Sequence, residues 1–352
     1  MIKIGTITFH WATNYGAVMQ AYALQKHLND IGYETEIINY VPSRIKIIQF
    51  LLNIKNMDFS QLKKEYRLKK FRKIELKISK HKYKNNKSLF DCSNKYNAII
   101  CGSDQIWNES FTSTVEGKPT LSYFLNFAGS KTKKISYAAS FGTDALSNKT
   151  KNIVLPELEK FESISVRENS GKIIIKDLGM DATLVLDPTM LLEKEGYNEL
   201  LSDKKFQNSP KVFSYIIHNN QTKAIEISNY IKSNYGKDVN EKYCDINCGL
   251  YEWLNNIKNA KVVVTNSFHG MVFSIIFNTP FIIIPIENSG MNDRITTLLG
   301  LLNLENRKIS EFNPKVIEDI LLQEIDWITV EENLKRLRAE SCNYLLNALK
   351  EN

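Results

Sequence analysis

The sequence predicts an α/β protein built from two facing Rossmann-like domains. Helical and strand patterns alternate along the chain in two series, one before residue 187 and one after residue 210. Most of the predicted strands are short, continuous apolar runs, which are typical of parallel strands buried on both faces. The 352 residues, 43% hydrophobic and 24% charged, fit an ordinary globular protein of about two domains.

The first series opens with a strand, a loop, a helix and a second strand. Residues 2–9 are apolar and β-branched, which indicates a buried strand. Residues 15–28 carry apolar side chains three and four apart, which predicts a helix ended by Gly32, and residues 35–40 form the next strand. Such a unit begins a doubly wound sheet. Further strands are expected over 97–101, 135–139, 163–166 and 183–186.

The second series repeats the alternation. We expect strands over 211–217, 238–244, 261–265 and 281–285, with helices over 222–235, 250–258 and 268–278. A long amphipathic helix is expected near the C-terminus over 330–349. The predicted organisation is an N-terminal domain over 1–187 and a C-terminal domain over 188–329. A final helical segment, 330–352, has packing back on the N-terminal domain as one option.

The net charge of +7 is concentrated in one segment. Residues 61–90 hold twelve Lys or Arg and two acidic residues, so this stretch carries +10 and the rest of the chain −3. Apolar residues lie near helical spacing within it, at Leu62, Tyr66, Phe71, Ile74 and Ile78. We therefore predict a basic helical insertion over about 43–90. It either packs on the N-terminal domain or contacts an anionic membrane surface. Because no nucleic-acid-binding motif accompanies the charge, we expect no nucleic-acid partner.

The sequence favours a cytoplasmic protein without a bound metal. No apolar run reaches the roughly 18–20 residues of a membrane span, and the N-terminus lacks the features of a signal peptide. The five cysteines are odd in number and scattered, which predicts buried free thiols rather than a zinc site.

The strongest candidate site is the stretch over 264–270, where an apolar strand runs directly into a helix. Asn266 or Ser267 can cap that helix, and the backbone N–H groups and the helix dipole then favour an anion. Ser267 adds a hydroxyl, His269 an acid or a cation, and Gly270 room for a ligand to approach. The alternative is an ordinary capped helix with a surface histidine.

Two further candidates follow strands of the first series. Arg167 comes after the strand over 163–166, and its guanidinium suits a phosphate or carboxylate; the alternative is a surface pair with Glu168. Asp104 lies in a Gly-Ser-Asp turn after the strand over 97–101. It is either a helix cap or a general base.

Aromatic and amide side chains in loops supply candidates for sugar binding. In the loop over 10–16, Trp11 and Tyr15 can stack on a sugar ring and Asn14 can hydrogen-bond to it. The alternative is that both aromatics fill an inter-domain core. Asp293 follows Asn292 in a charged pair that opens a helix, which is the ordinary place for an acidic residue.

Taken together, these stretches resemble the polysaccharide pyruvyl transferase family. The resemblance covers nearly the whole chain and is carried by residues 8–17, 101–108, 136–142, 165–168, 186–189, 266–270 and 292–295. The Gly-Ser-Asp-Gln-Ile-Trp-Asn block at 102–108 is similar to a branch that acts on bacterial surface polysaccharides.

The resemblance implies a glycosyltransferase-B-like fold and a transferase. Phosphoenolpyruvate would be the donor co-substrate, with no cofactor. The product would be a ketal of pyruvate bridging two hydroxyls of a glycan sugar, with phosphate released. Because acceptors of such enzymes are often lipid-linked, the resemblance also allows a peripheral position on the inner face of the membrane, through residues 61–90. It makes no prediction of oligomeric state.

The resemblance also assigns roles to individual residues. It matches Arg167 and His269 to the family's donor site. The candidate catalytic residues are His269, as the acid or as the group that steadies the leaving phosphate, and Asp104, as the base. The donor set is Arg167, Asn266, Ser267, His269, Gly270 and Arg294; the acceptor set is Trp11, Asn14, Tyr15, Gln105, Trp107 and Asn292. Some relatives carry a second arginine where this chain has Ser267, so one anion contact must come from Arg294 or from the helix N-terminus.

Two other functions are compatible with the sequence. One is a glycosyltransferase of the same architecture that uses a nucleotide sugar. The other is a catalytically silent family member that binds a glycan. The first would need a base-binding pocket and a diphosphate clamp in the second half, and no such pattern stands out.

Overall fold

The computed structural model describes residues 2–42, 59–110, 120–206, 209–217, 222–235, 248–287 and 289–350. The chain divides into two compact units. Unit 1 comprises Met1–Phe59, Lys69–Leu191 and Leu337–Asn352, and unit 2 comprises Ser60–Leu68 and Leu192–Arg336. The expected domain boundary at 187 thus lies just before Leu191. The strand expected over 238–244 lies outside the described residues.

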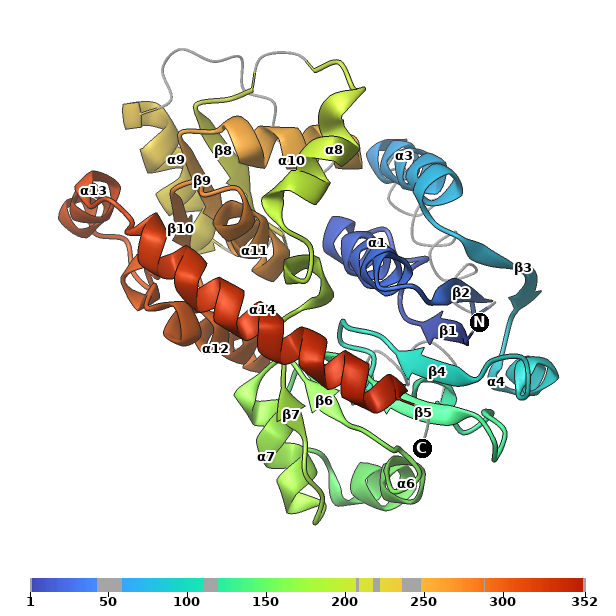
Figure 1. The fold of residues 1–352 in the computed structure, drawn as a ribbon. Coiled ribbons are helices and arrows are strands. Elements are labelled where there is room, and N and C mark those ends of the chain that lie inside the picture. The colour runs from blue at the N-terminus through green and yellow to red at the C-terminus, as the bar shows by residue number, and fades with distance from the viewer. Residues whose placement is uncertain are drawn as a thin grey trace. The chain divides into compact units, whose positions relative to one another are not determined.

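Unit 1 is built on a five-stranded parallel sheet with strand order β3-β2-β1-β4-β5, drawn in blue to green in Figure 1. Its strands are β1 (Lys3–Ile7), β2 (Glu34–Tyr40), β3 (Ile78–Tyr83), β4 (Ala98–Cys101) and β5 (Lys133–Ser136). The order reverses direction between β1 and β4, and ligands of doubly wound sheets bind beyond the carboxyl ends of strands at such a point.

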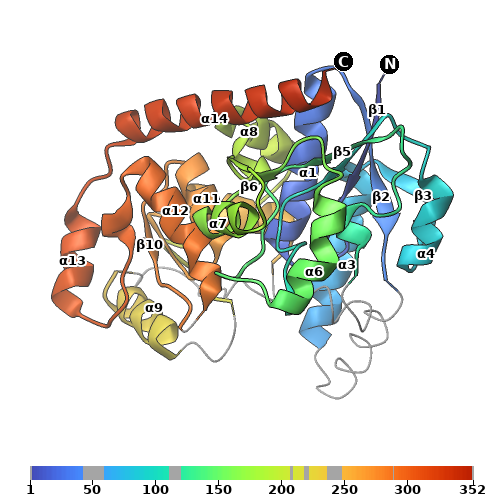
Figure 2. The same ribbon diagram turned by 90° about the horizontal axis from the view of Figure 1, so that it is seen from below.

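Helix α1 (Tyr15–Asp30) lies alongside β1 and β2 (Figure 2). Asn14 caps its first turn by accepting a hydrogen bond from the N–H of Ala17 at 3.1 Å. Its buried Leu24 and Leu28 pack with Ile4 of β1 in one apolar cluster. The packing of α1 against β1, together with its cap at Asn14, therefore holds the loop between them in place.

The basic insertion is only partly helical, which corrects the expectation for its second half. Helix α3 spans Phe59–Glu75, but Ile78–Tyr83 form strand β3 at the edge of the sheet. The backbone of β2 has an unpaired edge that β3 satisfies: the N–H of Ile37 donates to Lys77 and that of Val41 to Tyr83. This long-range pairing, together with burial of Tyr83, outweighs the local helical spacing of the apolar residues.

The remaining elements of unit 1 extend the sheet and cover it. Two short parallel strands, β6 (Ser165–Val166) and β7 (Thr183–Leu184), continue from β5 through an isolated bridge between Ile135 and Ser163. The helices are α4 (Asn86–Leu89), α6 (Asn148–Leu158) and α7 (Asn169–Asp177), with 3₁₀ turns at Phe90–Cys92, Ser122–Phe124 and Pro188–Met190.

Helix α14 (Trp327–Leu349) begins in unit 2 and ends in unit 1. In unit 1, the hydroxyl of Tyr344 donates to the carbonyl of Ser136 at 2.9 Å. The N–H of Leu186 donates to the hydroxyl of Ser341 at 3.0 Å. Leu345, Ala348 and Leu349 pack in the same apolar cluster as Ile4 of β1.

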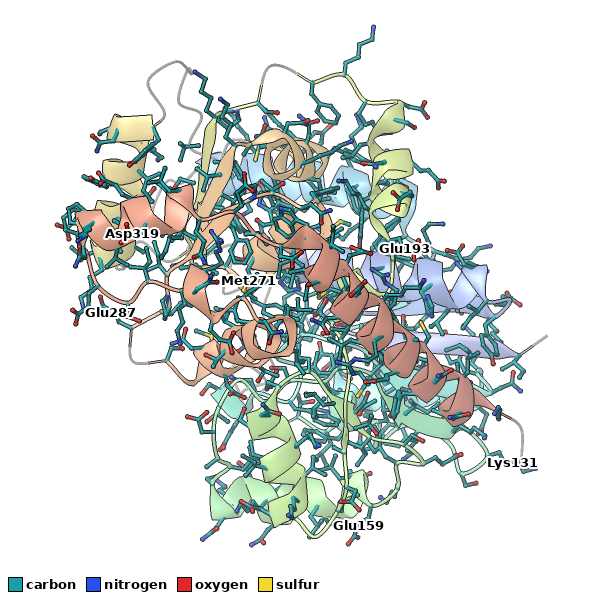
Figure 3. All side chains as sticks on the ribbon, turned by 60° about the vertical axis from the view of Figure 1, so that its left-hand side comes forward. Lys131, Glu159, Glu193, Met271, Glu287 and Asp319 are labelled. Carbon is teal, nitrogen blue, oxygen red and sulfur yellow. The ribbon has the colours of Figure 1, made fainter. Side chains whose placement is uncertain are left out.

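Unit 2 contains a three-stranded parallel sheet with order β10-β9-β8. The strands are β8 (Val212–Tyr215), β9 (Val262–Thr265) and β10 (Phe281–Ile283). The helices are α8 (Lys194–Ser202), α9 (Thr222–Tyr235), α10 (Leu250–Asn259), α11 (Phe268–Ile276), α12 (Asp293–Leu302) and α13 (Pro314–Leu322), with 3₁₀ turns at Gly290–Asn292 and Glu305–Arg307. Figure 3 shows Met271 of α11 inside this unit, with Glu287 and Asp319 at its outer edge.

Among the described cysteines, Cys92, Cys101 and Cys342 are free as expected, whereas Cys248 takes part in a disulfide. Cys244 lies outside the described residues. Among the described helices, none combines the length and the apolar character needed to cross a membrane.

Candidate active site

In unit 1, polar side chains join the loops that follow β1 and β4, where the sheet changes direction. The hydroxyl of Thr8 donates to the carbonyl of Ser103 at 2.8 Å. The amide of Gln20 on α1 donates to the Thr8 hydroxyl, also at 2.8 Å. All three residues are buried. This network holds the Gly-Ser-Asp turn at a fixed position beside the loop after β1.

Arg167, predicted at the end of β6, is buried and held from several sides. Its Nη1 lies 2.8 Å from Oδ2 of Asp187 and 3.2 Å from the hydroxyl of Ser103. That hydroxyl in turn donates to the same Asp187 oxygen at 2.8 Å. The N–H and the hydroxyl of Thr189 both donate to Oδ1, the other oxygen of Asp187, at 3.1 and 2.7 Å. A buried cation is stable only with such partners.

Three carboxylates surround the Arg167 guanidinium. Besides Asp187, Asp104 and Glu168 each place an oxygen 3.6 Å from one of its nitrogens. Burial alone would lower the pKa of the Arg167 guanidinium, but the carboxylates of Asp187, Glu168 and Asp104 raise it above its ordinary value. The cluster therefore has one positive charge against three carboxylates. Within the described residues, no set of three acidic, His or Cys side chains is arranged to hold a metal ion.

Asp104 is the one carboxylate of this cluster that reaches solvent. Its side chain is 17% exposed, against 2% for Glu168 and 0% for Asp187. Its backbone has a φ of +85°, a conformation that costs energy for a residue with a side chain. Its carbonyl accepts hydrogen bonds from the N–H groups of Ile106 and Ser140, which hold that conformation. Its Oδ1 accepts from the N–H of Gln105, so it does not act as a helix cap.

Glu168 and Gln105 join the Arg167 cluster to the loop after β5. Glu168 accepts a hydrogen bond from the N–H of Phe141 at 3.1 Å. Next to it, Gly142 has a φ of +62°, and a Cβ there would lie 2.5 Å from Oε1 of Gln105. The buried Gln105 also accepts from the amide of Asn108 at 3.2 Å. Its amide thus contributes to loop packing, and its predicted contact with an acceptor stays a prediction.

In unit 2, side chains at the carboxyl end of the sheet join β8 to the start of α11. The side chain of Asn266 accepts a hydrogen bond from the N–H of Ile217 and donates one to the carbonyl of Ile217, each at 2.7 Å. The hydroxyl of Thr265 donates to the carbonyl of Tyr215 at 2.6 Å. Asn266 is therefore a residue that joins two loops, and its amide is engaged in doing so.

Ser267 caps helix α11, which was one of the two caps that the sequence predicted. Its hydroxyl accepts a hydrogen bond from the N–H of Gly270 at 3.3 Å. A Cβ at Gly270 would lie 2.5 Å from the hydroxyl of Thr265. The space above Gly270 is thus occupied by strand β9, and we correct the expectation that this glycine leaves room for a ligand: it lets the helix approach the strand.

Two basic residues lie at the N-terminal end of α11. His269 is buried, which excludes the surface histidine of the alternative interpretation. Its ring meets the Phe268 ring edge-on, with centroids 5.2 Å apart. The guanidinium carbon of Arg294, in the first turn of α12, lies 5.4 Å from the centroid of the same Phe268 ring. The helix dipole, His269 and Arg294 together make this end of unit 2 suited to an anion.

Asn292 closes a loop next to Arg294. Its amide nitrogen donates to the carbonyls of Ile286 and Ser289, at 2.7 and 3.0 Å. Its Oδ1 accepts from the N–H of Ile286 at 2.9 Å. The side chain holds the entry into α12, which orients Arg294, and its predicted contact with an acceptor stays a prediction.

Of the aromatic candidates in unit 1, two lie in the core. Tyr15 and Trp107 are fully buried. The Trp107 ring stacks on Phe124 at 5.4 Å, and its N–H donates to the carbonyl of Tyr123 at 3.0 Å. A side chain packed in this way has no face for a sugar, so we correct the expectation of acceptor binding by Tyr15 and Trp107 to core packing.

Trp11 and Asn14 remain accessible in the loop after β1. Trp11 is half-buried against the core cluster of unit 1, with its ring centroid 5.6 Å from that of Phe9. Its indole nitrogen is buried and has no hydrogen-bond partner within the part of the chain that the structure describes. Asn14 is exposed, with its Oδ1 engaged in capping α1.

Sequence reasoning missed Asp187, Ser103 and Thr189 as members of the Arg167 cluster. Asp187 and Arg167 are 20 residues apart, and Ser103 and Arg167 are 64 apart. One signal was available: like Arg167, both Ser103 and Asp187 follow the end of a predicted strand. Carboxyl ends of parallel strands gather at one edge of a sheet.

The fold is shared with solved structures of sugar-nucleotide enzymes. UDP-N-acetylglucosamine 2-epimerase from Rickettsia bellii matches with a TM-score of 0.53 and 9% identity, covering 99% of this chain and 96% of that chain. The UDP complex of MnaA from S. aureus matches with a TM-score of 0.53 and 11% identity, covering 100% and 99%. At such identities the likeness establishes the fold alone. The protein is of the class with two Rossmann-like domains of glycosyltransferase-B type.

The family follows from the sequence. The model of the family "Polysaccharide pyruvyl transferase" matches residues 14–288, which is most of the chain, and this protein belongs to that family. None of the curated proteins matches the sequence significantly. The resemblance stated from the motifs is thereby confirmed, as is the predicted fold class.

Proposed function

We propose that this protein transfers the pyruvyl group of phosphoenolpyruvate to two hydroxyls of a glycan sugar, forming a pyruvate ketal in surface polysaccharide biosynthesis. The observation that carries the proposal is the contrast in charge between its two groups of polar residues. The N-terminal end of α11 has His269 and Arg294. The Arg167 cluster has a surplus of carboxylates, with Asp104 partly exposed. The reaction needs an anion site for the donor and a base for the acceptor.

The donor would be bound at the start of α11. Phosphoenolpyruvate carries up to three negative charges, so it needs cations and N–H donors. Arg294, whose guanidinium carbon lies 5.4 Å from the centroid of the Phe268 ring, is the candidate to replace the second arginine that some relatives carry where this chain has Ser267. Ser267 holds the first turn of the helix, so that its N–H groups keep their direction.

Each step of the proposed reaction has a residue of suitable chemistry. The first sugar hydroxyl attacks C2 of the donor while its proton passes to the Asp104 carboxylate. His269 is the proposed donor of the proton that the methylene carbon takes up when it becomes the methyl group. The second hydroxyl then displaces phosphate, and its proton leaves with that group or to solvent. General acid and base catalysis of this kind contributes typically about 10²–10⁴-fold to a rate.

The role of Arg167 differs from a simple contact with the donor. Its guanidinium already faces three carboxylates and is buried. This surrounding favours a positioning role, in which Arg167 holds the Asp104 carboxylate in a fixed orientation. A direct contact between Arg167 and the donor stays a prediction.

For the acceptor we propose the loop after β1. The half-buried Trp11 ring offers an apolar face on which a sugar ring can stack. Asn14, exposed at the start of α1, adds a polar group. The acceptor is a glycan, and the family name supports no finer identification.

Calorimetric titration tests the donor. We expect phosphoenolpyruvate to bind the wild-type protein and His269→Ala or Arg294→Ala to weaken that binding at least about tenfold, the loss of one charge-assisted contact. UDP-, GDP- and CMP-sugars should not bind. Binding of a nucleotide sugar without phosphoenolpyruvate would overturn the proposal in favour of a glycosyltransferase.

A second measurement tests the chemistry. Mixed with phosphoenolpyruvate and a pool of surface glycans, the protein should release phosphate and leave an acid-labile pyruvate on the glycan. Donor binding without any glycan-dependent phosphate release would support the silent, glycan-binding alternative and contradict transfer.

A further inference from the structure

One face of helix α3 is exposed, basic and apolar at once. Three large apolar side chains on it face solvent: Leu62 is 51% exposed, Tyr66 72% and Ile74 59%. Isolated apolar residues are common on protein surfaces, but three on one helical face need an explanation. They are three of the five apolar residues whose spacing predicted the helical insertion, and the structure leaves these three exposed.

The opposite face of α3 is the one that packs. Leu68 and Phe71 are fully buried there, and Lys64 and Arg72 are buried beside them. At 100° per residue, these positions lie on one side of the helix, and Leu62, Tyr66 and Ile74 lie on the other. The helix already packs against the protein with its other side. The exposed face is therefore a second, separate surface of α3 and not its core-packing face.

The exposed face carries four lysines and no acidic residue. These are Lys63, Lys69, Lys70 and Lys73, all exposed. The two acidic residues of α3, Glu65 and Glu75, are half-buried and lie toward the packed side. A solvated helix face normally mixes both signs of charge. A face of cations alternating with large apolar side chains is complementary to an anionic lipid surface.

We propose that this face of α3 binds the surface of an anionic lipid bilayer. Leu62, Tyr66 and Ile74 enter the boundary between headgroups and acyl chains, and the four lysines pair with lipid phosphates. This narrows the membrane contact expected of residues 61–90 to one side of α3, because β3 belongs to the sheet. The inference goes beyond the proposed function and holds whatever the donor is, since it concerns a surface with no residue assigned to the reaction.

Vesicle co-sedimentation of the full chain tests the proposal without any substrate. We expect binding to phosphatidylcholine vesicles that contain phosphatidylglycerol, and none to phosphatidylcholine alone. Raising the ionic strength from about 0.05 M to about 0.5 M should weaken the binding, because salt screens exposed charges.

Two triple variants separate the charge from the apolar part. Lys63→Gln/Lys70→Gln/Lys73→Gln should raise the lipid concentration for half-binding by at least about tenfold. Leu62→Gln/Tyr66→Gln/Ile74→Gln should raise it by about tenfold, with the salt dependence retained. The matched control is Lys315→Gln/Leu322→Gln on α13, whose side chains are also exposed and which should bind as wild type. Circular dichroism melting checks that each variant folds.

Three results would overturn the inference. Equal binding by the wild type and both α3 variants would place the contact elsewhere. Loss of binding in the lysine variant alone would leave electrostatic adsorption without insertion of Leu62, Tyr66 and Ile74. Failure to bind anionic vesicles, with tight binding of a labelled DNA duplex that the lysine variant loses, would assign the face to nucleic acid.

Discussion

The carboxyl ends of the two sheets use polar residues in opposite ways. In unit 1, Arg167 is buried among three carboxylates, so its charge is more than balanced within the protein. In unit 2, His269 and Arg294 lie at a helix N-terminus and add to its positive end. The same architecture thus produces one end suited to a base and one suited to an anion. The fold alone does not determine which chemistry each end supports, because the side chains at the strand ends decide it.

The largest expected effects separate the two ends by kinetics. Asp104→Asn should lower kcat by about 10²–10⁴-fold with donor affinity nearly unchanged, because the base is lost and the anion site stays. Arg294→Gln should chiefly weaken donor binding. Steady-state kinetics with phosphoenolpyruvate and a glycan acceptor would measure both, and the comparison fails if both substitutions change the same parameter.

Removing Asp187 should destabilise unit 1 strongly. Asp187→Ala leaves the buried Arg167 without its closest carboxylate, and breaking a buried pair from one side costs about 3–5 kcal/mol. Urea unfolding measures this change. Asp104→Asn is the control, because its partner contact is longer and its side chain is partly exposed, so a smaller loss is expected. Equal losses would mean that burial does not distinguish the two carboxylates.

Unit 1 should also respond to mild acid through His10. Burial lowers the pKa of this histidine to about 4, against about 6.5 when unfolded. Below pH 6.5, His10 of the unfolded chain binds a proton, whereas His10 of the folded chain stays neutral until the pH approaches 4. The stability present above pH 6.5 is therefore lost as the pH falls toward 4, by about 2 kcal/mol at pH 5. Urea unfolding at pH 7 and pH 5 should show this loss, and His10→Gln should reduce it by that amount. An unchanged pH dependence in the variant would contradict the assignment.

The smallest effect belongs to the cap of α11. Ser267→Ala removes the hydroxyl that accepts from Gly270 and should cost about 1 kcal/mol. Ser267→Asp keeps an acceptor and adds a negative charge at the proposed anion site. It should thus retain stability while weakening donor binding, which calorimetry and thermal melting together would show. Loss of stability in Ser267→Asp would indicate that the site does not tolerate a larger cap.

Local patterns predicted the elements of this fold well where one face of an element is buried. Helix α9 has the expected bounds, Thr222–Tyr235, and α10 differs only at its last residue. The prediction was wrong for Ile78–Tyr83, because their pairing with β2 is decided by a strand distant in sequence. Helical spacing in a basic segment gives no information about such a partner.

The candidate site divides in the same way. The capping of α11 by Ser267 was predictable because it depends on local sequence: a strand end, a cap and a helix start. The partners of Arg167 were not, since Asp187 and Ser103 come from separate loops. Trp107 shows a third limit. An aromatic side chain serves a core or a sugar equally well, and only its burial distinguishes the two.

The path of helix α14 has a consequence for the order in which the protein matures. Leu345, Ala348 and Leu349 pack in the same apolar cluster as Ile4, near the other end of the chain. A ribosome releases Ile4 first and Leu349 only after all of unit 2 has been translated. Unit 1 is thus the first to be synthesised and the last to be completed. Until α14 is made, the apolar cluster around Ile4 lacks the side chains that α14 contributes. Apolar surface exposed during synthesis makes a nascent chain prone to aggregation.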